Sequence, residues 1–127
     1  MTKTIIDASA WIEYFLGSKR GEKIKEILEE DNELITLPIT FAEIISYFVR
    51  VKIDINIATN NIKALSKLIN DSEFAQSAGE IHANIKSKNQ KFSLADAFIV
   101  ASAKKLNANI LTCDNDFRGI KEAIIIN

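Results

Sequence analysis

The sequence contains few of the residues that build disulfides, zinc sites or glycine-rich loops. Its 127 residues include one cysteine, one histidine, one proline and four glycines. Because Cys113 is alone, no intrachain disulfide can form, which fits a reducing cytosol. His82 has no second histidine and no pair of cysteines to complete a zinc site, so it is assigned a surface or packing role. The chain also has neither of the common glycine-rich phosphate-binding motifs.

Excess charge and long apolar runs are also missing. The net charge of −1 provides no basic field of the kind found on proteins that coat nucleic acid, although it leaves room for an enzyme with a local site. No segment approaches the ~20 apolar residues that a membrane span needs, and the amino end does not resemble a signal peptide. We therefore expect a cytoplasmic protein that does not bind membranes.

The composition is that of one soluble globular domain, with 47% hydrophobic and 26% charged residues. We find no repeat, low-complexity tract or linker, so a single domain over residues 1–127 is expected. Short β-favouring runs predict strands at 4–6, 34–37, 109–112 and 124–126. Apolar periodicity predicts helices at about 7–16, 21–30, 40–52, 56–69, 72–87 and 93–106. No strand is predicted between Lys52 and Ser93.

The predicted strands do not alternate between apolar and polar residues. Such strands are buried on both faces, as in a parallel sheet with helices on each side. We therefore expect an α/β fold with a central parallel sheet.

Four acidic residues share one context, at the end of an apolar run and the start of a predicted helix. They are Asp7, Glu43, Asp96 and Asp114. A parallel sheet brings such positions together at the edge where its strands end. Carboxylates gathered there repel one another unless a cation lies between them, and oxygen ligands suit Mg²⁺ or Mn²⁺.

Each acid also has a purely structural explanation. Asp7 is a suitable N-cap, residues 40–43 and 93–96 match the capping-box pattern, and Asp114 can cap a short turn. Capping and metal binding are compatible, since both place a carboxylate at a helix start. The sequence alone leaves the choice open for each acid.

Lysines cluster just before the helix that carries Asp96, at Lys86, Lys88 and Lys91. Solvated surface positions are the default interpretation. If the sheet edge is an active site, these lysines lie near its rim and can guide a phosphate backbone.

The acid-bearing segments resemble those of PIN-domain ribonucleases, and most closely VapC-type toxins of toxin–antitoxin pairs. The similar segments are IIDASAWIEYF, TFAEIISYF and SLADAFIVASAKKLNANILTCDNDF, and the resemblance covers nearly the whole chain. It implies a PIN-like α/β fold with about five short parallel strands between helices. It also implies a Mg²⁺- or Mn²⁺-dependent endoribonuclease that hydrolyses RNA, forms a homodimer and binds a small antitoxin.

The resemblance further implies roles for individual residues. The metal site would use Asp7, Glu43, Asp96 and Asp114, with Asp116 as a weaker ligand and Ser9 and Thr112 as supporting hydroxyls. Helices near the amino end would contact partners through Trp11, Tyr14 and Phe15.

Two alternatives remain. One is an aspartate-based phosphatase or phosphotransfer domain, although such a phosphatase requires a second acidic residue at the position that Ser9 occupies. The other is a non-catalytic PIN-like binding module, although all four acids are present.

Overall fold

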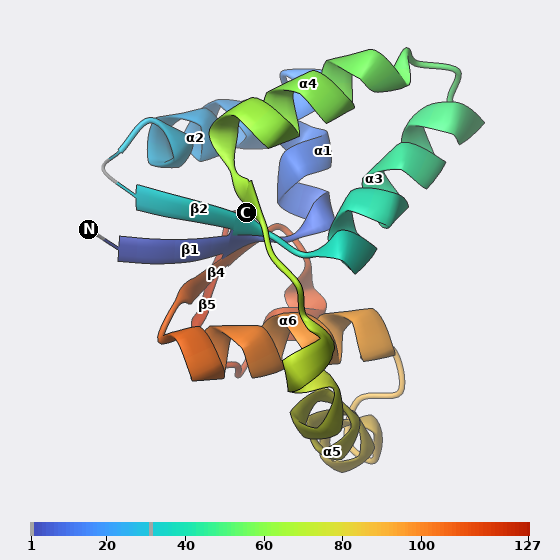
Figure 1. Cartoon of the computed structure of the whole chain (residues 1–127), viewed down its shortest axis with the longest axis vertical. Helices are drawn as coiled ribbons and strands as arrows, with labels where there is room; N and C mark the ends of the chain where they lie inside the picture. Colours follow the sequence, from blue (N-terminus) through green and yellow to red (C-terminus); the bar gives the residue numbers. More distant parts are fainter. Residues whose placement is uncertain (1, 31) are drawn as a thin grey trace.

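The computed structural model describes residues 2–30 and 32–127, and its centre is a parallel sheet with helices on both faces (Figure 1). The five strands are β1 (Thr2–Ile6), β2 (Asn32–Thr36), β3 (Lys67–Leu68), β4 (Asn109–Thr112) and β5 (Ala123–Ile125). They lie in the order β3-β2-β1-β4-β5, and every neighbouring pair is parallel. The α/β fold with about five short parallel strands is therefore confirmed.

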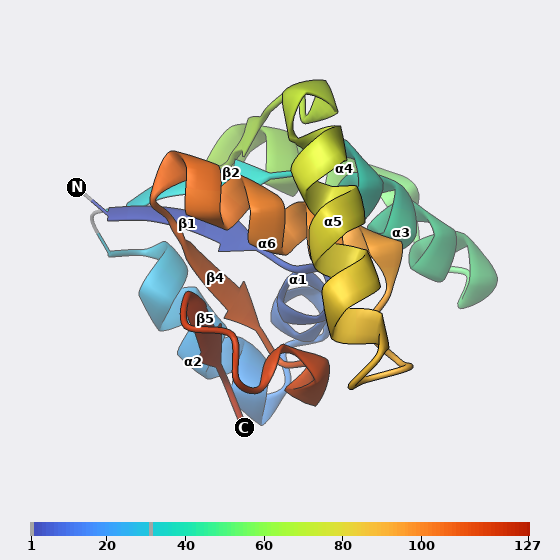
Figure 2. The same cartoon turned by 90° about the horizontal axis from the view of Figure 1, so that it is seen from below.

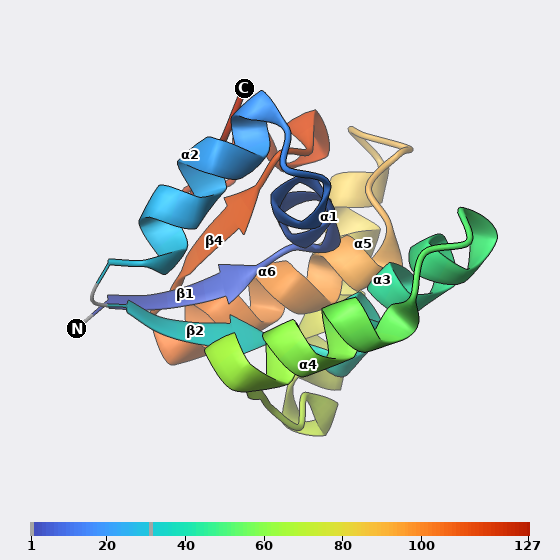
Figure 3. The ribbon, with the colours of Figure 1, turned by 90° about the horizontal axis from the view of Figure 1, so that it is seen from above.

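The helices divide between the two faces of the sheet. They are α1 (Ala8–Leu16), α2 (Lys19–Leu28), α3 (Pro38–Arg50), α4 (Ile55–Leu65), α5 (Ala75–Lys86) and α6 (Leu94–Leu106), with short 3-10 turns η1 (Ser72–Phe74) and η2 (Asn115–Phe117). Helices α5 and α6 lie on one side of the sheet (Figure 2), and α2 and α4 lie on the other (Figure 3).

Adjacent residues of each central strand enter different hydrophobic cores. Ile5 belongs to the core beneath α6, whereas Ile6 packs in the core with α1. Ile110 and Leu111 divide in the same way in β4. All four side chains are fully buried. Because both faces are covered, these strands read as unbroken apolar runs.

Strand β3 is the element that the sequence prediction missed. The helix expected over 56–69 ends at Leu65, and Lys67 and Leu68 pair with β2. Ser66 makes the junction, because its hydroxyl donates to the carbonyl of Ile62 and lies 2.8 Å from the hydroxyl of Thr36. The strand is only two residues long and exposed, so no apolar run marks it.

Helix α3 begins earlier than expected. Pro38 occupies its first turn, where a missing N–H costs nothing. Residues 40–43 therefore do not form a capping box, and that prediction was wrong. Thr40 is instead buried inside the helix, and its hydroxyl has no hydrogen-bond partner within the described residues. Glu43 lies in the second turn, away from the helix terminus.

Trp11 is a core residue and cannot be a partner contact. Its ring is fully buried, and its Nε1 donates to the hydroxyl of Thr36 at 3.1 Å. The ring stacks on Phe15 with centroids 5.6 Å apart, and Tyr14 meets it edge-on. Tyr14 and Phe15 remain partly exposed, so only these two are still candidates for a partner contact.

Candidate active site

The acids gather where the strand order of the sheet reverses. Strand β2, which follows β1 in the chain, pairs with one side of β1, and the later strand β4 pairs with the other side. Open α/β sheets bind ligands at the carboxyl ends of the strands beside such a reversal. Asp7 directly follows β1, and Asp114 follows β4 by two residues. Helix α3 starts after β2 and α6 runs back from the same edge, which brings Glu43 and Asp96 to it.

Asp7 is the most buried of these acids, with 6% of its surface exposed. It occupies the N-cap position of α1, but its side chain does not cap the helix. Instead, its Oδ2 accepts hydrogen bonds of 2.8 Å from the hydroxyls of Ser9 and Thr112. Asp7 is therefore the N-cap residue of α1, as the sequence predicted, but its side chain makes no capping hydrogen bond and is held by hydroxyls from α1 and β4.

The two hydroxyls also fix the segment that follows β4. They lie 3.1 Å apart, and Ser9 accepts from the backbone N–H of Cys113 at 2.9 Å. Thr112 accepts from the N–H of Asp114, also at 2.9 Å. Ser9 and Thr112 thus connect the carboxylate of Asp7 to the backbone that carries Asp114. This is the geometry of supporting residues around a central acid.

Asp114 caps η2, as the sequence predicted, by accepting from the N–H of Asp116 at 2.8 Å. Asp116 in turn receives a hydrogen bond of 3.4 Å from the side-chain amide of Asn89. Asn89 lies in the loop between α5 and α6. The sequence placed the lysines of this loop near the acids, but it gave Asn89 itself no role. A single asparagine in a polar loop gives no pattern that would have identified it.

Asp96 forms the capping box predicted with Ser93. Its Oδ2 accepts from the N–H of Ser93 at 2.9 Å, and its own N–H donates to the Ser93 hydroxyl at 3.0 Å. The carboxylate is therefore held at the start of α6, where its Oδ2 already accepts a hydrogen bond.

The acids influence one another electrostatically. Burial raises the pKa of Asp7, the hydroxyls of Ser9 and Thr112 partly offset this, and the charge of Asp114 adds to it. Burial also raises the pKa of Asp96, against the hydrogen bonds from Ser93, and the charges of Asp7 and Asp114 raise it further.

The pKa of Glu43 is raised as well. Desolvation first, and then the charges of Asp7 and Asp96, raise its pKa from 4.5 to about 7. The two ion pairs found within the described residues, Arg20–Glu13 and Lys104–Glu122, include none of these acids. The cluster is therefore a concentration of negative charge without a basic partner.

The donor set fits a hard divalent cation, because carboxylate oxygens are the ligands that Mg²⁺ and Mn²⁺ prefer. As the side chains stand, no three His, Cys, Asp or Glu residues in the described ranges are placed to hold a metal ion. Mutual repulsion keeps carboxylates apart, and a cation between them would remove that repulsion. Metal binding at this edge therefore requires the side chains to turn inward.

Cys113 is not a suitable nucleophile, although it lies beside the acids. Burial raises the pKa of its thiol, with Arg20 lowering it less. Since the thiolate is the reactive form, this environment makes the cysteine less reactive.

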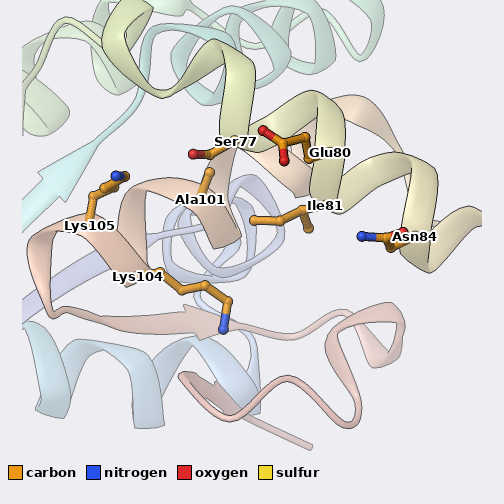
Figure 4. Close-up of a pocket in the computed structure, with 7 residues that line it drawn as sticks. All are labelled: Ser77, Glu80, Ile81, Asn84, Ala101, Lys104 and Lys105. Atoms are coloured by element: carbon orange, nitrogen blue, oxygen red, sulfur yellow. The ribbon is translucent and has the colours of Figure 1, made fainter.

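Two hollows lie near the acid-bearing helices. An apolar one of about 490 Å³ lies between the starts of α3 and α6 and is lined by Pro38, Ile39, Asp71, Leu94, Ala95 and Phe98. One of its lining residues, Ala95, directly precedes Asp96 in the chain. A second, of about 310 Å³, lies between α5 and α6 (Figure 4). Lys104 and Lys105 line it at the far end of α6 from Asp96, so it is separate from the acids.

Comparisons with known proteins agree with this architecture. The PIN domain family model matches residues 4–123. VapC20 of Mycobacterium tuberculosis, described as a sarcin–ricin loop cleaving toxin, is 16% identical with a TM-score of 0.77, covering 98% of this chain and 99% of that one. A chain of a toxin–antitoxin complex from Klebsiella pneumoniae is 21% identical, with a TM-score of 0.71 and 98% of both chains covered.

A chain of VapBC2 from Rickettsia felis, bound to promoter DNA, is 18% identical with a TM-score of 0.73, covering 98% of this chain and 97% of that one. At these identities the likeness shows a shared fold. A comparison with curated protein sequences gave no match. In the part of the chain that the structure describes, no helix is long and apolar enough to cross a membrane.

Proposed function

The chain belongs to the PIN domain family, and on that premise we propose that it is a divalent-metal-dependent endoribonuclease, the toxin of a toxin–antitoxin pair. The observation that carries the proposal is the placement of Asp7. It is a buried carboxylate at the carboxyl end of the central strand, and the charge of another acid, Asp114, raises its pKa. A cluster of that kind supports cation binding better than it supports any other chemistry available to these residues.

We assign the metal ligands to Asp7, Glu43, Asp96 and Asp114, with Asp116 as a weaker ligand. Ser9 and Thr112 orient Asp7 through the hydrogen bonds described above. A bound Mg²⁺ or Mn²⁺ would supply Lewis-acid stabilisation of phosphate charge and lower the pKa of water.

A proton acceptor is also needed for hydrolysis of a phosphodiester by water. Asp96 is our candidate, with Asp116 as the second choice. The raised pKa of Asp96 makes its carboxylate a stronger base than an ordinary aspartate. Its capping box holds it in place, so that the acceptor is positioned before the substrate binds.

The partners are proposed from the structural relatives. Among the solved chains with this fold, one belongs to a toxin–antitoxin complex and another is described as a sarcin–ricin loop cleaving toxin. By analogy, we propose that this chain cleaves RNA and pairs with a small antitoxin. The homodimer is proposed from the resemblance to PIN-domain toxins alone. We also propose that it acts in the cytoplasm.

Two rival functions fit less well. An aspartyl phosphatase needs a second acid two residues after the nucleophile, but Ser9 stands there and donates to Asp7. A non-catalytic binding module has no need for a buried carboxylate beside other acids, which costs stability when no cation is bound.

RNA cleavage by matched amide variants tests the catalytic proposal. Asp7→Asn and Glu43→Gln remove charge with little change in shape, and we expect both to lose Mg²⁺-dependent cleavage of RNA. Asp54→Asn is the control, because Asp54 caps α4 through the N–H of Asn56, outside the acid cluster. Cleavage at the wild-type rate by either variant would remove that residue from the site, and full cleavage in EDTA would end the metal mechanism.

Growth of a bacterial host tests the toxin assignment. Induced wild-type protein should arrest growth, the Asp7→Asn variant should not, and co-expression of the small protein encoded next to it should restore growth. Unimpaired growth with active, soluble wild-type protein would instead indicate a housekeeping nuclease.

A further inference from the structure

The loop between α5 and α6, residues 87–93, is attached to the acid cluster through Asn89. Its side-chain amide donates to Oδ1 of Asp116, and Asp116 donates its backbone N–H to Asp114. This loop and the segment around η2 lie side by side in two views of the molecule (Figures 2 and 3).

Further contacts fix the shape of this loop. The backbone N–H of Lys91 donates to Oδ1 of Asn89 at 3.1 Å, and the N–H of Phe92 donates to the carbonyl of Asn89 at 3.2 Å. The ring of Phe92 is fully buried and meets the ring of Phe117 edge-on, with centroids 6.0 Å apart. The loop is therefore packed onto the end of η2 at a defined position beside the acids.

The two joined segments together carry three exposed basic residues. Lys88 and Lys91 flank Asn89, and Arg118 follows Asp116 by two positions. Neither of the ion pairs found within residues 2–30 and 32–127 includes any of the three. Lys86 differs from them, because its Nζ already binds the carbonyl of Gln90. Three exposed cations therefore lie on the two segments that the Asn89–Asp116 hydrogen bond joins, and none of them takes part in an ion pair among the described residues.

We propose that Lys88, Lys91 and Arg118 form a basic rim that binds the phosphate backbone of the RNA beside the cleavage site. The inference rests on the proposed function and assigns the strand-holding surface of that same site. A cluster of carboxylates repels a polyanion, and the net charge of −1 provides no general attraction. Phosphate contacts of this kind position the strand without reading its sequence.

The salt dependence of RNA binding is the measurement that isolates this role. Each phosphate contact on a single strand contributes about −0.7 to the slope of log K against log salt concentration. Removal of all three cations in Lys88→Ala/Lys91→Ala/Arg118→Ala should therefore flatten the slope by about 2. The probe is a fluorescein-labelled single-stranded RNA of mixed sequence, titrated by anisotropy in EDTA so that no cleavage occurs.

The matched control removes the same charge elsewhere, in Lys3→Ala/Lys25→Ala/Lys63→Ala. These lysines are exposed on β1, α2 and α4, and each lies toward the amino edge of the sheet. We expect the control to keep the wild-type slope. In Mg²⁺, the rim variant should show a KM for RNA cleavage raised about tenfold with kcat nearly unchanged, as expected when binding is lost equally in ground and transition states.

The outcomes separate this proposal from the one it rests on. If wild-type protein cleaves RNA and the rim and control variants share one slope and one KM, the proposed RNA-binding role of the rim is wrong. The proposed nuclease function is then unaffected. If wild-type protein neither binds nor cleaves RNA, the proposed function fails and the rim with it. A rim variant that loses kcat with KM unchanged would also contradict the proposal, because these residues would then act in the chemistry. Circular dichroism of every variant confirms that the fold is kept.

Discussion

The hydroxyl of Thr112 donates a 2.8 Å hydrogen bond to Oδ2 of Asp7, although 105 positions separate the two residues. The bond joins the ends of β1 and β4, which are neighbours in the centre of the sheet. The same oxygen of Thr112 accepts from the N–H of Asp114. One side chain therefore fixes the positions of two of the proposed metal ligands.

Replacement of Thr112 by valine should weaken the site strongly. The change leaves the N–H of Asp114 without its partner and takes one donor from Asp7, at an expected cost of about 1–3 kcal/mol in stability. We expect metal affinity and cleavage to fall by about 10- to 100-fold, as for other residues that orient metal ligands. Thr112→Ser keeps the hydroxyl and should restore most of the activity. Wild-type activity in Thr112→Val together with a loss in Thr112→Ser would show that the methyl group matters, and not the hydrogen bonds.

Asp7→Asn should raise the thermal midpoint of the metal-free protein while it abolishes cleavage. The raised pKa of Asp7 means that burial of the charged form is unfavourable, and the amide removes that charge. An amide oxygen in the place of Oδ2 can still accept from both hydroxyls. Calorimetry in EDTA measures the change. A lowered midpoint would mean that the carboxylate stabilises the fold without a cation, which contradicts our account of the cluster.

The stability of the metal-free protein should depend on pH through Glu43. Its pKa is about 7 in the folded chain and 4.5 ordinarily, so between these values the folded state binds more protons than the unfolded state. The free energy of unfolding therefore falls as pH rises from 4.5 to 7. Asp7 and Asp96, whose pKa values are also raised, act in the same direction.

Glu43→Gln should flatten this pH dependence and stabilise the metal-free protein above pH 7. Thermal midpoints measured across the window in EDTA give the comparison, with Glu26→Gln on α2 as a control that removes an exposed carboxylate elsewhere. Identical slopes for wild type and Glu43→Gln would show that this carboxyl does not titrate in the window.

The joint between α1 and α2 should tolerate no side chain at Gly21. A Cβ there would lie 2.1 Å from the carbonyl oxygen of Glu13, which is backbone and cannot move aside alone. Gly21→Ala should therefore destabilise the protein by about 1–3 kcal/mol. Gly79→Ala is the matched change in α5, where nothing lies within 4 Å, and should stabilise by about 0.5–1 kcal/mol. Urea titrations of both variants measure the change in the free energy of unfolding. Equal destabilisation of the two variants would contradict the close contact between Gly21 and the backbone of Glu13.

The central strands and the acid positions could be predicted from sequence because both depend on local patterns. Strands such as β1 and β4, buried on both faces, appear as apolar runs, and each is followed by an acid. The capping box of Ser93 and Asp96 follows from side chains three residues apart. The family resemblance supplied the residue roles, and those roles remain proposals.

The missed features depend on contacts between distant segments. Strand β3 exists because β2 has an open edge and Ser66 bonds to Thr36, which no local pattern reveals. The carboxylate of Asp7 accepts from hydroxyls of α1 and β4, and the hydroxyl of Thr112 comes from a residue 105 positions away. Asn89 reaches Asp116 across 27 positions, and neither residue's neighbours indicate the other.

If the chain is the toxin proposed here, the position of β4 beside β1 also governs when it becomes harmful to the cell that makes it. On the proposed function, a growing chain on the ribosome has β1, β2 and the first acids long before β4 is made. Strand β4, which carries Thr112, must then pair with β1 before Asp7 can accept the hydrogen bond from the Thr112 hydroxyl. Nearly the whole polypeptide is therefore synthesised in a harmless form, and a truncated product that stops before β4 stays harmless.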